Sequence, residues 1–277
     1  MKIRTTADPV GFKAAVFPFL AKDPVLNTTV LSTVQGRIEG IMEDPEPPIY
    51  VSLHDGGAVI GAVVWTALRG IVMGVLDDDL VPPLVDALAD LIPTADSVEG
   101  TATAAPLFAE LFAARAGKSF RKLRGTRLHQ LDVFIDQKAS GTARLATRTD
   151  LEVTAKLSHG YSLALGYESS PAIAENWARG RIDLGRLWLW EYNGQTVSLV
   201  GRQNEAFGAT RIGPVYTPPE FRGHGYASAL TARVTQEILS TGSKACLFTD
   251  LANPTSNKIY AAIGYRPVAD FLGFGFS

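Results

Sequence analysis

The chain has 277 residues, enough for one large domain or two ordinary domains, and we expect two. Hydrophobic residues make up 46% of the chain and charged residues 19%, which is typical of a compact protein and excludes a disordered or fibrous one. The formal net charge of -2 provides no basic field for a phosphate backbone, so we expect no nucleic-acid partner.

The single cysteine, Cys246, excludes an intrachain disulfide and a cysteine-rich metal site, and it indicates a reducing compartment such as the cytoplasm. The four histidines are scattered without ligand spacing, so we expect no metal. No window reaches the roughly 18 uncharged apolar residues that a membrane span needs. The apolar run at 14–20 is interrupted by Pro18 and predicts an ordinary amphipathic helix.

The first half of the chain predicts strands, helices and one clear hairpin. Asp55-Gly56-Gly57 separates two β-rich runs and tolerates positive φ, which is typical of a hairpin turn. The predicted elements are strands at 49–54, 58–65 and 70–76, a helix at 79–91, a strand at 96–100, a helix at 104–116, and a strand that ends at 131–135.

A polar, turn-rich stretch at 136–142 predicts a linker, and a second set of elements follows it. Asn193-Gly194 predicts another hairpin turn. The predicted elements are a strand at 143–147, helical segments within 150–181, strands at 186–192, 195–202 and 207–216, a helix at 224–241, a strand at 244–250, a helix at 254–263, and a terminal strand. Because both halves show a similar order, we expect two copies of one fold, 1–138 and 139–277, of which one is degenerate.

The loop after the 207–216 strand has the features of an anion site. Its sequence is Arg222-Gly223-His224-Gly225-Tyr226-Ala227-Ser228, and apolar residues spaced three or four apart show that a helix begins inside it. A helix N-terminus carries unpaired N–H groups and about half a positive charge, and the two glycines let an anion approach the backbone. The alternative is a glycine-containing turn that only caps the helix.

Two other phosphate loops do not fit this stretch. A P-loop ends in Gly-Lys-Ser/Thr, which is absent here, and the dinucleotide fingerprint needs Gly or Ala where Ser228 stands.

The loop resembles the pyrophosphate motif of the GCN5-related N-acetyltransferases (GNAT), which reads Arg/Gln-x-x-Gly-x-Gly/Ala. Arg222, Gly225 and Ala227 fill its fixed positions. A second block of the family, an asparagine, a helix with a tyrosine and then Gly-Phe/Tyr, is matched by Asn253, Tyr260 and Gly264-Tyr265. The resemblance is specific over 207–267, extends over 140–277, and is only topological before that.

The resemblance implies an α/β fold with a mixed, mostly antiparallel central sheet flanked by helices, as two tandem GNAT-like domains. The cofactor would be acetyl-CoA, held where the strand ending at Val215-Tyr216-Thr217 diverges from the strand ending near Asp250. Backbone groups of Val215 and Thr217 would bind the pantetheine amides. The residues implied for the cofactor are Val215, Tyr216, Thr217, Arg222, Gly223, His224, Gly225, Tyr226, Ala227, Ser228, Asn253 and Asn257.

In this family an amine attacks the thioester carbonyl directly, and Tyr260 lies where a hydroxyl donates a proton to the departing thiolate. An amine with a pKa of about 10.4 must lose a proton, which costs roughly 4 to 5 kcal/mol at pH 7. The family often uses a glutamate on the strand before the loop, but Phe207–Tyr216 contains no carboxylate. Glu205, Asp250 and a chain of water molecules remain as candidates for the base.

Two further patterns carry expectations. Trp188, Trp190 and Tyr192 alternate on one face of a strand, which favours core packing over an aromatic acceptor pocket. Asp77-Asp78-Asp79 stands where the first copy would have its phosphate loop and would repel a pyrophosphate, so we expect no CoA there; alternatively these residues only cap a helix.

These observations predict an N-acetyltransferase that transfers an acetyl group from acetyl-CoA to a small-molecule or peptide amine. The first alternative is a non-catalytic acyl-CoA sensor, which the missing strand carboxylate favours. The second is transfer of a different acyl group on the same fold. His224 is either a phosphate contact or an exposed loop residue.

Overall fold

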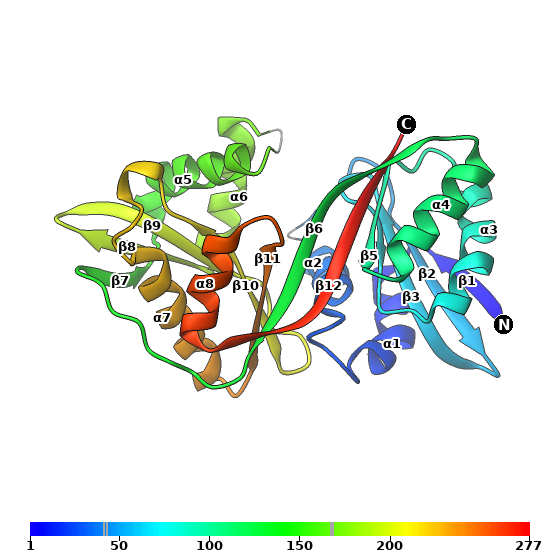
Figure 1. Cartoon of the computed structure of the whole chain (residues 1–277), viewed down its shortest axis with the longest axis horizontal. Helices are drawn as coiled ribbons and strands as arrows, with labels where there is room; N and C mark the ends of the chain where they lie inside the picture. Colours follow the sequence, from blue (N-terminus) through cyan, green and yellow to red (C-terminus); the bar gives the residue numbers. More distant parts are fainter. Residues whose placement is uncertain (41, 43, 167–168) are drawn as a thin grey trace. The chain divides into compact units, whose positions relative to one another are not determined.

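The computed structural model describes residues 1–40, 42, 44–166 and 169–277, and they form two compact units (Figure 1). Unit 1 comprises Met1–Leu128, Thr249–Asn253 and Pro267–Ser277, and unit 2 comprises His129–Phe248 and Pro254–Arg266. The chain therefore returns to unit 1 twice after it has entered unit 2.

The first half of the chain forms strands and helices in the order β-α-α-β-β-β-α-β-α-β. A short 3₁₀ turn at Asp78–Leu80 leads into its third helix. The elements are β1 (Lys2–Thr6), α1 (Pro9–Leu20), α2 (Thr28–Ile38), β2 (Ile49–Asp55), β3 (Ala58–Thr66), β4 (Gly70–Met73), α3 (Val81–Leu91), β5 (Ser97–Thr101), α4 (Ala104–Ala116) and β6 (Phe120–Leu131).

The second half repeats the same order, and a 3₁₀ turn at Pro219–Phe221 again leads into the third helix. The elements are β7 (Thr142–Leu145), α5 (Leu151–Ala164), α6 (Pro171–Asp183), β8 (Leu187–Tyr192), β9 (Gln195–Arg202), β10 (Ala209–Tyr216), α7 (Tyr226–Ser240), β11 (Lys244–Asp250), α8 (Pro254–Ile263) and β12 (Tyr265–Phe276). The repetition of element order that we expected is present, and it includes one strand and two helices at the start of each half.

Each unit has a mixed sheet in which most neighbours are antiparallel. In unit 1, β1, β2, β3 and β4 pair antiparallel in that order, and β5 pairs parallel with β4. In unit 2, β7, β8, β9 and β10 pair antiparallel in that order, and β11 pairs parallel with β10. The predicted fold class, an α/β fold with a mostly antiparallel sheet flanked by helices, is confirmed.

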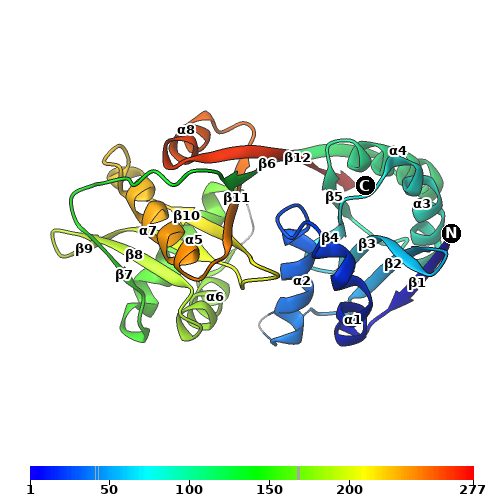
Figure 2. The ribbon, with the colours of Figure 1, turned by 90° about the horizontal axis from the view of Figure 1, so that it is seen from below.

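Strand β12 belongs to both units. It begins at Tyr265 in unit 2, whereas Phe271–Gly275 pair antiparallel with Ser97–Thr101 of β5 in unit 1. Figure 2 shows the red end of β12 beside β5. Ser277 and Ser119 then exchange two backbone hydrogen bonds of 2.8 and 3.1 Å. The last strand of the second half therefore completes the sheet of unit 1.

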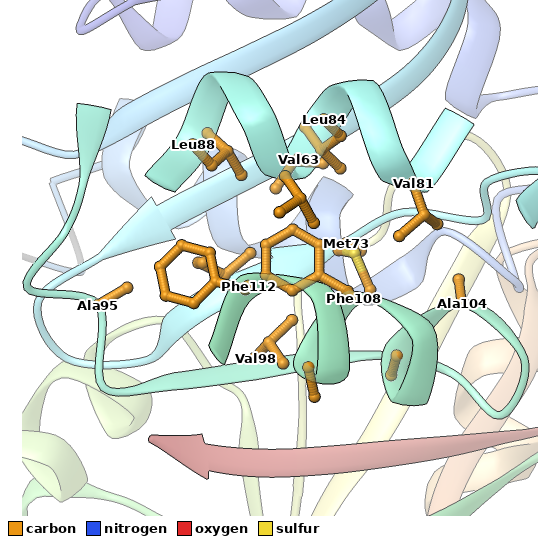
Figure 3. Close-up of a cluster of buried hydrophobic side chains, with 14 of the residues drawn as sticks. Val63, Met73, Val81, Leu84, Leu88, Ala95, Val98, Ala104, Phe108 and Phe112 are labelled. Atoms are coloured by element: carbon orange, nitrogen blue, oxygen red, sulfur yellow. The ribbon is translucent and has the colours of Figure 1, made fainter. Parts of the chain in front are cut away.

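The core of unit 1 lies between its sheet and the pair α3 and α4 (Figure 3). Phe108 and Phe112, one helical turn apart on α4, are fully buried, and their rings stack at 5.4 Å. Burial of each such side chain stabilises the fold by about 1.5–3 kcal/mol. On the opposite face, Phe12 of α1 stacks on Tyr50 of β2 at 5.1 Å, so helices cover both faces of this sheet.

In unit 2 the face covered by α7 and α8 includes Trp188 and Trp190, which are 6% and 7% exposed and pack with Tyr226 and Leu230. The core-packing interpretation is confirmed for these two tryptophans but not for Tyr192, at the end of the same strand, which is 37% exposed. The opposite face, under α5 and α6, buries a second cluster built from Leu157, Ile182, Leu187, Leu189 and Leu199.

Several element boundaries differ from the sequence prediction. Strand β4 ends at Met73 and not at 76, and β10 begins at Ala209 and not at 207. Strand β6 runs over Phe120–Leu131, so the predicted strand end at 131–135 is wrong: the chain leaves the sheet after Leu131, and Val133 and Ile135 are exposed. The helical segments expected within 150–181 are the separate helices α5 and α6; the part of that prediction at residues 167 and 168 lies outside the described residues. The run at 14–20 lies within helix α1, as expected, and no described helix is long and apolar enough to cross a membrane.

Candidate cofactor site

Strand β10 leaves its parallel neighbour halfway along its length. Ala209 to Ile212 pair with Lys244 to Leu247 of β11, and the described pairing of the two strands ends there. The register with β9 shifts between Ile212 and Val215, at the irregular Gly213-Pro214 step that the sequence predicted. Beyond the shift, Val215 and Tyr216 continue to pair with β9. The carboxyl end of β10 is therefore splayed from β11.

The splay leaves backbone groups of β10 directed toward the gap. The hydroxyl of Ser198 on β9 donates to the Tyr216 carbonyl at 3.1 Å, which places the Tyr216 backbone on the β9 side. Since backbone groups of successive residues in a strand point to opposite edges, those of Val215 and Thr217 face away from β9. These are the groups that the resemblance assigns to the pantetheine amides.

Two glycines with left-handed backbone shape the loop between β10 and α7. Gly223 has φ of +83° and Gly225 has φ of +80°, conformations that L side chains rarely adopt. A Cβ atom on Gly223 would meet no other atom within 4 Å. Gly225 is the N-cap of α7. The glycines are thus required by the turn itself, and they leave its outer side open.

The N-terminus of α7 offers donors for an anion. The first helical hydrogen bond of this segment runs from Ala229 N to Gly225 O, so the N–H groups of Tyr226, Ala227 and Ser228 precede the intrahelical ladder. Arg222, which is exposed, donates from Nε to the Thr217 carbonyl at 3.0 Å and closes the loop against the end of β10. Three N–H groups, a helix dipole and a guanidinium therefore occur together.

His224 and the linker lie beside this loop. His224 is exposed, and its ring stacks on Tyr226 at 5.5 Å. The linker passes next to the helix start, because a Cβ atom on Gly225 would lie 3.7 Å from Ala139 Cβ and 3.8 Å from Lys138 O. Sequence reasoning placed the linker at 136–142 but did not predict that it flanks the loop, since only the tertiary fold brings the two together.

Three tyrosines from different elements gather near the splayed end of β10. The rings of Tyr161 on α5 and Tyr216 are 6.4 Å apart in an edge-on arrangement. Tyr260 on α8 is 7% exposed, and burial, with a smaller contribution from Tyr161, raises the pKa of its hydroxyl. The Tyr260 hydroxyl therefore keeps its proton at neutral pH, as a proton donor must. Sequence reasoning missed Tyr161, although its position four residues after the buried Leu157 places it on the sheet-facing side of α5.

Positive charge collects on the face of the sheet that α5 and α6 cover. Burial, and then the charges of Arg186 and Arg211, lower the pKa of Arg181 to about 10. Arg181 donates to the Arg202 carbonyl and to Gln203 Oε1, both at 3.3 Å, and its guanidinium lies 4.6 Å from the Trp177 ring centre. These partners are neutral, and Tyr161 is close enough to raise the pKa of Arg181.

The two carboxylates considered as the base differ in their surroundings. Glu205 is exposed in the turn before β10, where its carboxylate accepts from Gly208 N. This placement argues against Glu205 as the general base. Strand β10, about 25 Å long for its eight residues, separates the turn that holds Glu205 from Tyr216. Asp250 ends β11 and accepts from Ala252 N at 2.7 Å through Oδ1.

The asparagines of the second block lie around the start of α8. Asn253 N donates to Asp250 O at 3.0 Å in the turn that precedes the helix, and Asn257 is half-buried within the helix. Asp250 and Asn253 fall in Thr249–Asn253, which is grouped with unit 1, whereas Asn257 and Tyr260 are in unit 2. The cofactor-binding roles of Asn253 and Asn257 stay predictions.

In unit 1 the corresponding loop, between β4 and α3, carries Asp77, Asp78 and Asp79, all exposed. Asp77 precedes the 3₁₀ turn and makes no capping hydrogen bond through its side chain. The acidic run therefore stands at the same point of the element order as Arg222–Ser228 in unit 2. Across the described residues, no three His, Cys, Asp or Glu side chains form a group suited to a metal ion.

Comparison with known proteins identifies the fold. Residues 192–270 match the family described as "FR47-like protein". No curated protein matches the chain. Among solved structures, a GNAT-family acetyltransferase from Colwellia psychrerythraea is similar over 100% of both chains, with 11% identity and a TM-score of 0.62.

Two further structures are similar over nearly the whole chain. A GCN5-related N-acetyltransferase from Sphaerobacter thermophilus has 15% identity and a TM-score of 0.61, and covers 99% of this chain and 95% of its own. A tandem GNAT protein from the clavulanic acid biosynthesis pathway has 11% identity and a TM-score of 0.60. The match covers 100% of the present chain and 98% of the chain of that protein. The resemblance seen in the sequence is confirmed: the chain has the fold of the GCN5-related N-acetyltransferases, with an FR47-like segment at residues 192–270.

Proposed function

We propose that the chain is an N-acetyltransferase that uses acetyl-CoA, with the cofactor in unit 2. The observation that carries this proposal is the splay of β10 from β11 next to the left-handed Gly223 and Gly225 at the start of α7. The gap would take the pantetheine arm, and the loop N–H groups would take the pyrophosphate. Hydrogen bonds to charged groups are worth about 1.5–3 kcal/mol each, so three of them supply about 4.5–9 kcal/mol of the roughly 8 kcal/mol that micromolar affinity requires, and contacts to the pantetheine arm would supply the rest.

In the proposed reaction a neutral amine attacks the thioester carbonyl carbon, a C–N bond forms, and the C–S bond breaks. The sulfur leaves with the bonding electron pair and receives a proton from the Tyr260 hydroxyl, and Tyr260 then regains a proton from solvent, so the products are the N-acetylated acceptor and free CoA. The proton of the amine passes to Asp250 or to water. Asp250→Asn separates these two routes: kcat falls about 100-fold if the carboxylate is the base and stays unchanged if water is.

The positive charge around Arg181 favours an acceptor that also carries a carboxylate, such as an amino acid. Arg181 has only neutral hydrogen-bond partners among the described residues, and Tyr161 lies close enough to both Arg181 and Tyr260 to raise the pKa of each. An acceptor carboxylate would supply the opposite charge. We expect glycine to be a better acceptor than methylamine or ethanolamine, and we expect Arg181→Met to remove that preference by raising KM for glycine alone.

The first test is calorimetric titration of acetyl-CoA into the wild type and two variants. Gly225→Glu places a carboxylate in the loop, and Gly242→Glu is its control, because Gly242 has nearly the same φ of +81° at the other end of the same helix. We expect micromolar binding in the wild type, no binding in Gly225→Glu, and wild-type binding in Gly242→Glu. Lack of binding by the folded wild type contradicts the proposal.

An acyl-CoA sensor and a transferase of another acyl group are the alternatives. The absence of a carboxylate within β10 favours the sensor, and the buried Tyr260 hydroxyl, which holds its proton because burial raises its pKa, favours the enzyme. A screen of amines for release of free CoA decides between them: binding without release supports the sensor. Release that is faster with propionyl-CoA or butyryl-CoA supports a different acyl donor.

We assign the catalytic role to residues 139–277 and a supporting, CoA-free role to the degenerate first copy, residues 1–138. The acidic Asp77–Asp79 run in the β4–α3 loop supports this division, because three carboxylates there would repel a pyrophosphate. The single buried cysteine favours a cytoplasmic location. Titration of acetyl-CoA should therefore give one site per chain.

A further inference from the structure

Unit 1 contains a pocket of its own, with a volume of about 330 Å³. It lies between the start of α1, the end of α2 and the start of β2. The volume is at the lower end of the range for small-molecule sites. Its apolar lining comes from the prolines at 9, 45, 47 and 48 and from Met42. We call it the Tyr50 pocket.

The Tyr50 hydroxyl is the unusual feature of this pocket. Tyr50 is 0% exposed, and its hydroxyl has no hydrogen-bond partner among the described residues. A buried hydroxyl without a partner costs free energy, so the great majority of such groups in folded proteins are bonded to protein or to a bound molecule. The ring is held by stacking on Phe12 at 5.1 Å, so the hydroxyl cannot turn away. It is a donor and acceptor fixed at the wall of a cavity.

The charged residues around the hydroxyl give the pocket a negative balance. Arg37 and Asp44 form a bidentate pair, with Nε–Oδ2 at 2.5 Å and Nη2–Oδ1 at 2.6 Å, and their side chains are 5% and 3% exposed. The remaining Nη1 of Arg37 donates to Thr33 O at 2.8 Å. Arg37 therefore has no unused nitrogen for an anion. Glu46 also lines the pocket, and no described residue pairs with its carboxylate. Burial is the main cause that raises the pKa of Tyr50, and the charges of Asp44 and Asp8 add to it while that of Arg37 opposes it.

We propose that the Tyr50 pocket binds a small aliphatic ammonium ion. Its N–H groups donate to the Tyr50 hydroxyl and to the carboxylate of Glu46, and its alkyl part packs against the prolines and Met42. An anion is disfavoured because Arg37, the cation among the described lining residues, is already paired with Asp44, and a neutral alcohol gains no charge-assisted hydrogen bond. This site is separate from acetyl transfer and does not depend on the proposed function.

The test uses the full chain and n-butylammonium chloride as the probe, with n-butanol and sodium butyrate as probes of the same carbon count. Saturation-transfer NMR and calorimetry at pH 7 should show saturable binding of n-butylammonium, at least tenfold weaker binding of n-butanol, and none of butyrate. A wild type that shows no saturable binding up to about 50 mM, or that binds the three probes equally, overturns the proposal.

Two variants locate the binding, and each has a matched control. Tyr50→Phe and the surface change Glu46→Gln should each weaken n-butylammonium binding at least threefold. Tyr265→Phe, at a buried tyrosine of unit 2, and Glu110→Gln, at an exposed position on α4, should leave it unchanged. Tyr50→Phe removes an unsatisfied hydroxyl, so denaturant unfolding should show no loss of stability. Wild-type affinity in both Tyr50→Phe and Glu46→Gln places the ammonium elsewhere and overturns the proposal.

Discussion

The hydroxyl of Tyr216, at the end of β10, lies 2.8 Å from the position that a Cβ atom on Gly160 of α5 would occupy. The ring atoms Cε1 and Cζ lie at 3.0 Å, so alanine at this position must displace the ring. Tyr216 is one of the residues expected at the cofactor, and Gly160 therefore permits the close approach of α5 to the splayed strand end.

We expect Gly160→Ala to reduce acetyl-CoA affinity at least threefold, because the displaced Tyr216 disturbs the neighbouring Val215 and Thr217. The control is Gly180→Ala on α6, where a Cβ atom meets nothing within 4 Å. That change should stabilise the protein by about 0.5–1 kcal/mol through helix propensity and leave affinity unchanged. Titration calorimetry and urea unfolding of both variants measure the two effects, and equal affinities would contradict a role for this contact.

Tyr260→Phe should lower kcat about 10–100-fold with little change in the Kd of acetyl-CoA. The reason is that the departing thiolate loses its proton donor while the buried ring is kept. Tyr265→Phe is the matched control: its ring lies 6.3 Å from that of Tyr260, but its hydroxyl is bonded to Thr235 Oγ1 at 2.8 Å. It should cost about 0.5–1.5 kcal/mol of stability and leave kcat unchanged. Steady-state kinetics that show the same loss in both variants would assign Tyr260 a structural role.

Gly264→Ala should destabilise the protein by more than 3 kcal/mol. A Cβ atom there would lie 1.8 Å from the Val133 carbonyl oxygen, and φ is +105°. Backbone cannot move aside as a flexible side chain can, and the strained conformation adds to the cost. Gly242→Ala has a positive φ but open space, so it should cost only about 1–2 kcal/mol. Unfolding in guanidinium measures the loss of stability in each variant. A similar small loss in Gly264→Ala and Gly242→Ala would show that the added Cβ atom at Gly264 does not clash with the Val133 carbonyl.

Because Asp150 is paired with Arg144, the free energy of unfolding should decrease at acidic pH. Its carboxylate binds Arg144 through two hydrogen bonds of 2.7 Å and accepts from Thr147 N, and these contacts, chiefly that with Arg144, hold its pKa well below the usual range. Because the folded state then binds fewer protons than the unfolded state, the free energy of unfolding decreases as the pH drops below about 4, the pKa of a free aspartate.

We expect Asp150→Asn to cost about 1–3 kcal/mol at pH 7 and to flatten the acid dependence between pH 4 and 2. Asp183→Asn is the control, since the Arg148–Asp183 pair is on the surface, with the Arg148 side chain 83% exposed, and should leave the stability nearly unchanged. Urea unfolding across this pH range tests the expectation, which is wrong if the wild type and Asp150→Asn show parallel pH profiles.

Local signals in the sequence were sufficient for most of the elements. Asn193 and Gly194 both adopt positive φ, at 49° and 73°, as their hairpin turn requires, and helix α4 runs over the predicted 104–116. Helix α2 was not predicted, because its residues Thr28, Thr29, Val30, Thr33 and Val34 have low helix propensity. Burial of that face, with Val30, Leu31 and Val34 at 0–1% exposure, overrides the propensity.

Some residues of the candidate site were likewise predictable from the sequence, and others were not. The predicted phosphate loop is a contiguous motif, so its residues and the helix that follows it were recognisable in the sequence. Tyr161 and the linker at Lys138 and Ala139 were not, because their approach to Tyr216 and Gly225 depends on how α5 and the linker pack on the sheet. The path of β12 into unit 1 was equally unpredictable, since no local pattern states which edge a terminal strand joins.

That path of β12 sets an order of events during synthesis. Residues 1–128 leave the ribosome before β12, whose Phe271–Gly275 pair with β5, and Ser119 finds its backbone partner only at Ser277. The edge of β5 therefore stays unpaired until β12 has been synthesised. Loss of Phe271–Gly275 would thus damage the half of the protein that was made first.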